Sequence, residues 1–232
     1  MILPKWEELP GEMKNDSVAE YYQILKRKKI SLVVKRVFDF LVALLMLIVI
    51  SPILLILSIL IKIDSDGPVF YRQERVTTGS KTFRIFKFRT MVVNADKMGS
   101  LVTVGNDSRI TRVGEKIRKC RLDELPQLLN IITGDMSFVG TRPEVRKYVD
   151  CYSDEMLATL LMPAGVTSLA SITYKDENEI MEERISKGES ADEAYVNHVL
   201  PEKMKYNLEY LKTFSFFGDL KLMIYTVLAV LR

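Results

Sequence analysis

The sequence is poor in the residues on which many enzymes depend: it has one histidine, His198, and two cysteines, Cys120 and Cys151. A single histidine argues against a histidine dyad and against a histidine-rich metal site, so acid chemistry would have to come from Asp and Glu. The two cysteines lack zinc-type spacing and cannot build a dense disulfide framework. They are typical of a reducing compartment, where thiols stay free.

The chain also lacks a strong excess of charge of one sign. It has 33 Lys and Arg against 30 Asp and Glu, a formal net charge of +3. Nucleic-acid-binding domains usually carry a larger basic excess, so we expect no nucleic-acid partner. No Walker or Rossmann glycine pattern is present, which disfavours an ATPase or an NAD enzyme. With 48% hydrophobic residues, most of the chain is expected to fold.

A long apolar run does occur, at residues 40–61, and it contains no charged residue. Its length is close to the roughly 20 residues that a bilayer-crossing helix needs. It begins too far from Met1 for a cleavable signal peptide, and no small-residue cleavage site follows it. Ser51-Pro52 lies in its middle. Proline removes a backbone donor, so we expect a bend there, with the Ser51 hydroxyl satisfying a freed carbonyl.

Basic residues flank this run on both sides. Residues 26–29, Lys35 and Arg36 precede it, and Lys62 follows it. The positive-inside rule then places both ends in the cytoplasm, which favours a re-entrant helix that turns at Ser51-Pro52. An ordinary kinked span remains the alternative from the residues alone. Lys35 and Arg36 are expected to contact anionic lipid headgroups.

After the apolar run the pattern changes to that of a water-exposed domain. Strands are expected at 69–71 and 82–88, joined by a turn at 77–80. Residues 166–174 are β-rich, and the charged stretch 176–193 is a solvated helix or a loop. The apolar end, 220–232, is too short to span a bilayer and predicts a core helix or one lying in the membrane interface. Further helices are expected at 94–99, 110–120, 124–132, 144–161 and 195–211.

The acid pair Asp123-Glu124 is the most informative motif. Asp123 is a good N-cap type, and Pro126 fits only the first turn of a helix, so a helix is expected to begin near Asp123 or Glu124. A helix N-terminus favours anions and would keep Asp123 ionised, as a nucleophile requires. Adjacent helical residues point about 100° apart, which suits separate roles, one nucleophile and one metal ligand or base. A capping acid beside a solvent-facing Glu is the structural alternative.

Basic side chains are grouped around this pair in the sequence. Arginine is suited to bidentate contacts with phosphate, and together these residues could hold a diphosphate. Any single one of them could instead form a weak surface ion pair. The candidates for substrate binding are Arg118, Arg142, Lys87, Arg89 and Arg72.

Taken in order, the motifs of this chain resemble the bacterial sugar transferases, the monotopic class of polyprenol-phosphate phosphoglycosyl transferases. The likeness covers about residues 35–173. Two positions depart from the family pattern: Thr141 stands where proline is usual, and Thr77 where glycine is usual. The matching segments are residues 35–39, Ser51-Pro52, 67–76, 86–91, 107–111 (DSRIT), 122–127 (LDELPQ), 134–140 (GDMSFVG), Arg142-Pro143 and 163–167.

The resemblance implies roles that periodicity does not show. Asp123 matches the family's nucleophile and Glu124 its acidic partner at a Mg²⁺ site, while Arg118 and Arg142 match basic active-site residues. The reaction would pass a sugar-1-phosphate from a UDP-sugar to polyprenol (undecaprenyl) phosphate through a covalent aspartyl-phosphosugar, releasing UMP. It would initiate the assembly of capsule, exopolysaccharide or O-antigen at the cytoplasmic face of a bacterial inner membrane. A homodimer is compatible with this.

The expected fold class is therefore mostly α with small β elements (α+β). Residues 1–34 are expected to form an N-terminal arm and residues 35–62 a re-entrant membrane helix hinged at Ser51 and Pro52. Residues 63–232 are expected to form a compact cytosolic catalytic domain with a C-terminal membrane-associated helix, and amphipathic interfacial helices pack on this domain. Two other hypotheses stay open. One is a non-catalytic membrane scaffold that binds anionic lipid or a partner, and the other is a one-step transferase in which Asp123 only binds metal.

Overall fold

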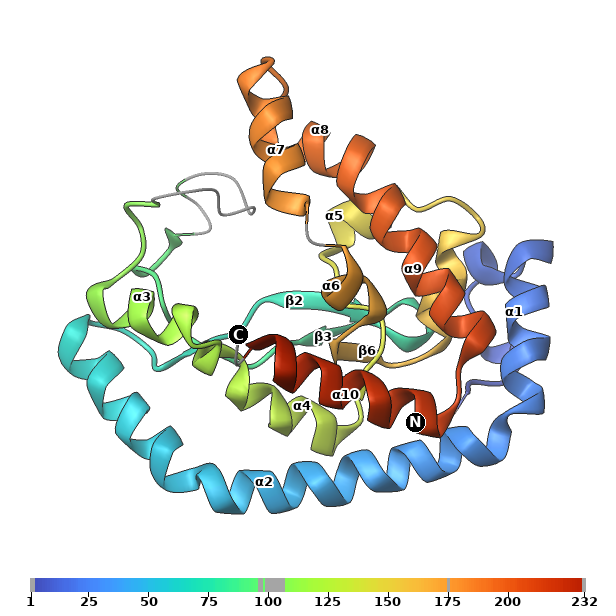
Figure 1. Ribbon diagram of the computed structural model, residues 1–232, viewed down its shortest axis with the longest axis horizontal. Coiled ribbons are helices and arrows are strands. Elements are labelled where there is room, and N and C mark those ends of the chain that lie inside the picture. Colours follow the sequence, from blue (N-terminus) through green and yellow to red (C-terminus); the bar gives the residue numbers. More distant parts are fainter. Residues whose placement is uncertain (1–2, 96–97, 99–106, 175, 231–232) are drawn as a thin grey trace.

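The computed structural model describes residues 3–95, 98, 107–174 and 176–230. Within them the fold is mostly helical with small sheets, as the sequence predicts (Figure 1). The α-helices are α1 (Asp16–Arg27), α2 (Lys29–Asp64), α3 (Arg112–Lys119), α4 (Leu128–Thr133), α5 (Arg146–Val149), α6 (Leu169–Thr173), α7 (Glu177–Ser186), α8 (Ala191–Ala194), α9 (Leu200–Thr213) and α10 (Phe216–Val230). Short 3₁₀ segments are η1 (Trp6–Glu8), η2 (Gly11–Met13), η3 (Thr78–Ser80), η5 (Leu122–Gln127) and η6 (Met156–Leu161), and η7 (Tyr195–Val199) is a π-helical turn.

The described strands pair in twos. β1 (Phe70–Tyr71) pairs with β4 (Lys87–Phe88), and β2 (Glu74–Thr77) with β3 (Lys81–Arg84), both antiparallel. β5 (Met136–Val139) and β6 (Ala164–Thr167) are parallel. The strand expected at 82–88 is thus divided between two partners. The side chain of Asn130 explains the break, because it accepts from the Phe86 N–H and donates to the Arg84 carbonyl in place of a neighbouring strand.

Three further expectations need correction. The helix expected at 144–161 is two short pieces, α5 and η6, because Ser153 Oγ accepts from Met156 N and starts the second one. The β-rich stretch 166–174 is a strand only to Thr167. The Ser168 side chain then accepts from Ser171 N and caps α6. The helix expected at 94–99 falls mostly outside the described residues.

The expected apolar run lies inside α2, a single helix of 36 residues. By length and composition alone, α2 is suited to crossing a membrane. Pro52 offers no N–H to the carbonyl of Ile48, and Ser51 Oγ donates to that carbonyl at 2.8 Å. The predicted compensation by Ser51 is therefore confirmed. Figure 1 shows that α2 turns toward the rest of the molecule in its second half.

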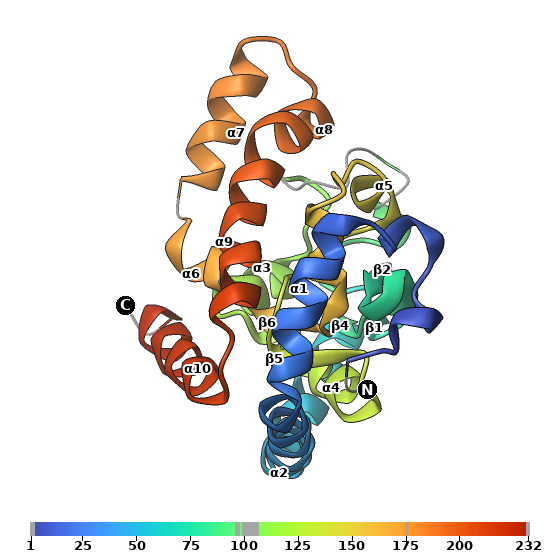
Figure 2. The same cartoon turned by 90° about the vertical axis from the view of Figure 1, so that its right-hand side faces the viewer.

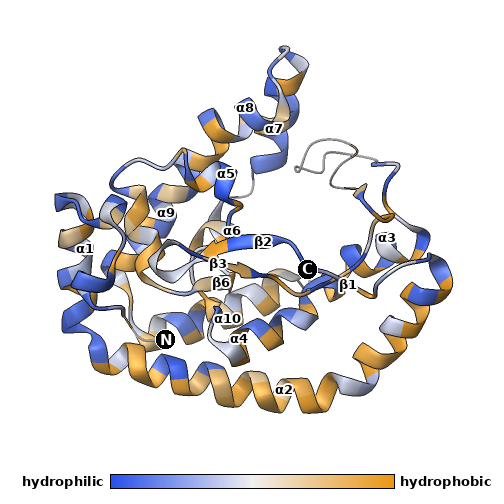
Figure 3. Cartoon of the chain, turned by 180° about the vertical axis from the view of Figure 1, so that it is seen from behind, coloured by the Kyte–Doolittle hydropathy of each residue, from blue (hydrophilic) through white to orange (hydrophobic). Residues whose placement is uncertain are grey.

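The two ends of α2 are attached to the same body of the protein. Near the start, Lys35 Nζ donates to Asp219 Oδ2 of α10 at 2.6 Å and to the Val139 carbonyl at 2.9 Å. Asp39 accepts from Ser137 Oγ at 2.6 Å. At the far end, Asp64 accepts from the N–H of Val113 at the start of α3. Between these attachments the outer face of α2 is apolar and exposed (Figure 3).

This anchorage overturns the expectation that Lys35 lies against lipid headgroups. Lys35 is only 4% exposed, because Asp39 and Asp219 draw its ammonium group inward. The neighbouring Arg36 is also directed at protein. Its guanidinium donates to the carbonyls of Ile131 and Ile132 at the end of α4, where a cation is favourable.

The residues expected as a separate N-terminal arm are packed into the main core. Met13, Val18, Tyr21 and Leu25 are buried, and α1 lies against α9 and η6. α2 follows one residue after α1, so the chain passes from the arm into the long helix without a linker. Figure 2 shows α2 and α10 at one end of the molecule and α7 and α8 at the opposite end.

We expect Lys35→Met to lower the free energy of unfolding by about 3–5 kcal/mol, since it leaves Asp39 and Asp219 buried without their cation. Thermal and denaturant unfolding of the detergent-solubilised chain measures this. Lys26→Met, at an exposed position of α1, is the matched control. The double variant Lys35→Met/Asp219→Asn should recover part of the loss. Equal stability of Lys35→Met and Lys26→Met would contradict the role given to this ion pair.

Candidate functional site

The acid pair lies in a tight turn between α3 and α4. Arg121 has a left-handed backbone (φ 55°) that ends α3, and η5 follows with Asp123 and Glu124 in its first turn. The expected α-helix start at Asp123 or Glu124 is therefore wrong, because α4 begins only at Leu128. Pro126 lies inside η5. A short 3₁₀ turn tolerates proline there, whereas the interior of an α-helix would lose a backbone hydrogen bond. Asp123 is not an N-cap, since Arg121 occupies that position.

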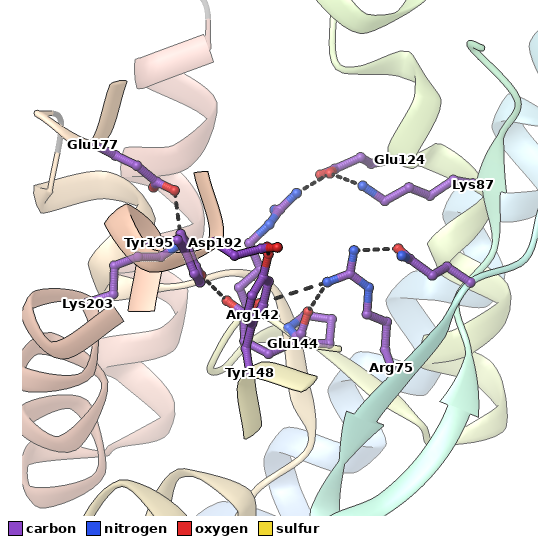
Figure 4. Close-up of polar contacts among 12 residues, drawn as sticks. Arg75, Lys87, Glu124, Arg142, Glu144, Tyr148, Glu177, Asp192, Tyr195 and Lys203 are labelled. Atoms are coloured by element: carbon purple, nitrogen blue, oxygen red, sulfur yellow. Dashed lines mark hydrogen bonds and ion pairs between the residues drawn. The ribbon is translucent and has the colours of Figure 1, made fainter. Parts of the chain in front are cut away.

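Glu124 is held between two cations from other parts of the chain. Lys87 Nζ of β4 donates to Glu124 Oε1 at 2.8 Å, and Arg142 Nη2 donates to the same oxygen (Figure 4). The Glu124 side chain is 12% exposed. Burial opposes its ionisation, but Arg142 and Lys87 outweigh burial and lower the pKa of Glu124 to about 2. Glu124 is therefore a fixed carboxylate and not a proton donor.

Asp123 has a different environment. It is half-buried, and burial raises its pKa, while Lys87 and Arg118 act in the opposite direction and Glu124 adds to the rise. The expected α-helix N-terminus is not present at Asp123; Lys87 and Arg118 favour its charged form, and burial opposes it. The pKa values of the two acids are shifted in opposite directions and their partners differ, which agrees with separate roles for them.

The structure distributes the other candidate residues unevenly. Lys87 and Arg142 contact Glu124, and Arg118 lies close enough to act on Asp123. Arg89 is buried elsewhere, with its guanidinium donating to Ser65 and Asp66 just beyond α2. Arg89 therefore stabilises the end of α2, and the expectation that it binds substrate is wrong. Arg72 is exposed, and its guanidinium carbon lies 3.4 Å above the centre of the Phe86 ring.

The loop that carries Arg142 is fixed by a close backbone contact. Gly165 N donates to the Thr141 carbonyl at 2.8 Å, and Gly140 N donates to the Thr167 carbonyl at 3.0 Å. A Cβ on Gly165 would lie 2.3 Å from Gly140 N, so β6 and this loop approach only because the residue is glycine. Thr141 takes part through its backbone. Its replacement of the usual proline is therefore compatible with the position of Arg142.

A group of polar residues beyond Arg142 was not predicted from the sequence. Glu144 accepts from Tyr195 Oη of η7 and lies 3.9 Å from Arg75 Nη1 of β2. Lys203 of α9 donates to Tyr195 Oη at 3.3 Å. Arg75 lies in a motif-bearing segment and Glu144 directly follows Arg142-Pro143, but Tyr195 and Lys203 stand in a helical stretch without any recognisable motif, so only the fold reveals them.

Asp123 and Glu124 suit Mg²⁺ bound together with a phosphate. Mg²⁺ usually takes one or two carboxylates from the protein and fills its other positions with water and substrate phosphate. Among the described residues no cluster of three or more His, Cys, Asp or Glu could enclose a metal ion by itself. The acid pair offers two carboxylates, within the number that Mg²⁺ usually takes from a protein.

The site thus places two carboxylates among three cations, in a chain whose α2 is long and apolar enough to cross a membrane. The chain belongs to the bacterial sugar transferase family, which it matches over residues 30–232.

Several curated proteins resemble it. One from Aeromonas hydrophila, a UDP-N-acetylgalactosamine-undecaprenyl-phosphate N-acetylgalactosaminephosphotransferase, is 34% identical over 97% of this chain and 50% of its own length. A UDP-glucose:undecaprenyl-phosphate glucose-1-phosphate transferase from Caulobacter vibrioides is 34% identical over 85% of this chain and 69% of its own. A putative undecaprenyl-phosphate N-acetylgalactosaminyl 1-phosphate transferase from Bacillus subtilis is 42% identical over 54% of this chain and 70% of its own. The chain thus spans about half the length of the Aeromonas protein.

The depressed pKa of Glu124 predicts a pH dependence. A carboxylate whose folded pKa lies below its unfolded value adds stability that is full above the unfolded value, here near 4.5, and is lost as the pH falls toward about 2. We expect the difference in unfolding free energy between the unmodified chain and Glu124→Gln to shrink from neutral pH to near pH 3. Denaturant titrations at both pH values measure it, with Glu179→Gln on α7 as the control. If the difference in unfolding free energy did not change with pH, Glu124 would not be an ionised carboxylate held by Lys87 and Arg142.

Proposed function

We propose that this chain transfers a sugar-1-phosphate from a UDP-sugar to undecaprenyl phosphate and releases UMP. The observation that carries the proposal is the Asp123-Glu124 pair enclosed by Lys87, Arg118 and Arg142, in a chain of the bacterial sugar transferase family. The named activities of the relatives from Aeromonas hydrophila and Caulobacter vibrioides give the substrate classes.

The first step that suits this geometry is attack by Asp123. Its carboxylate oxygen forms a bond to the phosphorus that carries the sugar, and the bond from that phosphorus to the bridging oxygen breaks. UMP leaves with the bridging oxygen. Asp123 is suited to attack because, within the part of the chain that the structure describes, no ion pair holds its carboxylate, whereas Lys87 and Arg142 clamp Glu124.

The second step restores the enzyme. An oxygen of undecaprenyl phosphate attacks the same phosphorus, a new diphosphate linkage forms, and the Asp123 carboxylate is released. One diphosphate is exchanged for another, so the reaction needs no separate energy source. Lys87, Arg118 and Arg142 are positive groups already fixed around the acids, which lets them stabilise the charge on the transferred phosphoryl group.

Mg²⁺ is part of the proposal, with Glu124 as its protein ligand. When bound, it would neutralise negative charge on the diphosphate. Glu124 meets the requirement of such a ligand because its pKa of about 2 keeps it ionised. Arg142 and Lys87 occupy Oε1 of Glu124 and orient the group.

A re-entrant α2 would bring this site to the cytoplasmic face of the inner membrane. Supporting it, the beginning and the end of α2 bind the same body, through Lys35 with Asp219 and through Asp64 with Val113. A helix crossing the bilayer would carry one end away from that body. α10 lies at the same end of the molecule and adds an exposed apolar face, made of Phe217, Ile224, Tyr225, Val227 and Leu228 (Figure 2).

Asp123→Asn is expected to abolish transfer from UDP-sugar to undecaprenyl phosphate, because the amide cannot form the acyl phosphate. Incubating the unmodified chain with UDP-sugar alone should add the mass of one sugar phosphate to the peptide that contains Asp123, and the Asn variant should show none. Glu115→Gln, an exposed acid on α3, is the control. Turnover by Asp123→Asn would exclude the nucleophile. Normal transfer with no trapped adduct would favour one-step transfer.

The topology of α2 is tested by cysteine labelling. In a Cys120→Ser/Cys151→Ser background, Lys29→Cys and Lys62→Cys place single exposed thiols near the two ends of the helix. A membrane-impermeant maleimide should label both in inside-out vesicles and neither in right-side-out vesicles. A separate Cys120→Ser variant that keeps the exposed Cys151 marks the side on which the domain after α2 lies. Labelling of the two sites from opposite sides would establish an ordinary span.

A further inference from the structure

A cavity of about 170 Å³ lies on the side of Arg142 away from the α3–α4 turn, between the loop after β5 and the C-terminal helices. Figure 4 shows Arg142 between the two regions, with its guanidinium directed toward Glu124. Six of the side chains that line the cavity come from β2, that loop, α7, η7 and α9. They are Arg75, Arg142, Glu144, Glu177, Tyr195 and Lys203.

Arg142 also lines this cavity, but its guanidinium is bound to Glu124, and the other charges in the lining balance one another. Arg75 faces Glu144 at 3.9 Å, and Lys203 lies 3.4 Å from Glu177 Oε1. Tyr195 Oη donates to Glu144 and accepts from Lys203. The acid pair at Asp123 is different, since three cations there serve two carboxylates. A phosphate would be repelled by Glu144 and Glu177, so the cavity suits a neutral ligand that offers both donors and acceptors.

The size of the cavity is that of one ring. An engineered cavity of about 150 Å³ takes up benzene, whereas pockets for whole drug-sized ligands measure about 300–1,000 Å³. A nucleoside diphosphate is therefore too large for a space of about 170 Å³. A single pyranose fits the volume, and its hydroxyls match carboxylates that accept and a lysine that donates.

We propose that this cavity binds the sugar ring of the donor, and that Glu177 and Lys203 determine which sugar is accepted. The inference rests on the proposed transfer from a UDP-sugar. In such a donor the sugar is bonded directly to the phosphate that Asp123 attacks, so its ring has to occupy a space next to the acid pair. The cavity meets this condition because Arg142 belongs to both: it binds Glu124 and lines the cavity.

Glu177→Ala tests the assignment, with Glu179→Ala on the same helix as the matched control. Glu177 lines the cavity, and Glu179 is exposed. Loss of a hydrogen bond to a charged group changes binding by about tenfold or more. We expect KM for the UDP-sugar to rise about tenfold, the inhibition constant of UDP to stay unchanged, and the preference between UDP-glucose and UDP-galactose to shift. Lys203→Met should act in the same direction, with folding of each variant checked by thermal unfolding.

The possible outcomes separate this inference from the function beneath it. If the unmodified chain transfers sugar phosphate and Glu177→Ala behaves like Glu179→Ala in KM and preference, the sugar assignment is overturned while the proposed function stands. If Glu177→Ala weakens inhibition by UDP as much as it weakens donor binding, the cavity holds the nucleotide, and the assignment is again overturned. If the unmodified chain transfers sugar phosphate from no UDP-sugar, both fall.

Discussion

The ion pair that joins Lys35 to Asp219 is the interaction on which the arrangement of the whole molecule depends. It is buried, and it connects the start of α2 to α10, while Lys35 also binds the carbonyl of Val139 at the end of β5. A buried charge is tolerated only where partners satisfy it, so these three segments are obliged to meet at one point. The start of the long helix is thereby fixed to β5 and α10 by directional polar contacts, in contrast to an apolar helix held by hydrophobic contact alone.

The candidate site is connected to this ion pair through the segment that follows β5. β5 ends at Val139, and the chain then passes through the glycine contact with β6 to Arg142, whose guanidinium closes on Glu124. Anchorage of the long helix and geometry of the site are therefore connected through only a few residues. At the other end of α2, Arg89 performs the second attachment, while Lys87 two residues earlier reaches the acid pair. The short segment 87–89 thus links the helix end to the site.

The sequence predicted correctly those features that depend on neighbouring residues. The compensation of Pro52 by Ser51, the turn at 77–80 and the helical end of the chain all follow from neighbouring residues, and the structure contains each of them. The acid pair and its three cations, Lys87, Arg118 and Arg142, were identifiable because their motifs are short and ordered. Predictions that depended on distant partners were wrong. Lys35 is turned inward by Asp219, which is 184 positions away, and Arg89 is occupied by Ser65 and Asp66. No periodicity in the sequence distinguishes these two cations from those that face a substrate.

The regions on the two sides of Arg142 differ in net charge, and this difference matches the two parts of the proposed donor. On one side, cations outnumber carboxylates and no cage of acids encloses a metal among the described residues, so the positive field is available to a diphosphate. On the other side, Arg75 and Lys203 each have their own carboxylate, and the guanidinium of Arg142 is bound to Glu124, so the cavity is polar with little net charge. A donor with a charged diphosphate and a neutral sugar has the same division within itself. Arg142 lies between the two regions. A bound donor would therefore be positioned with the junction between its charged diphosphate and its neutral sugar next to Arg142.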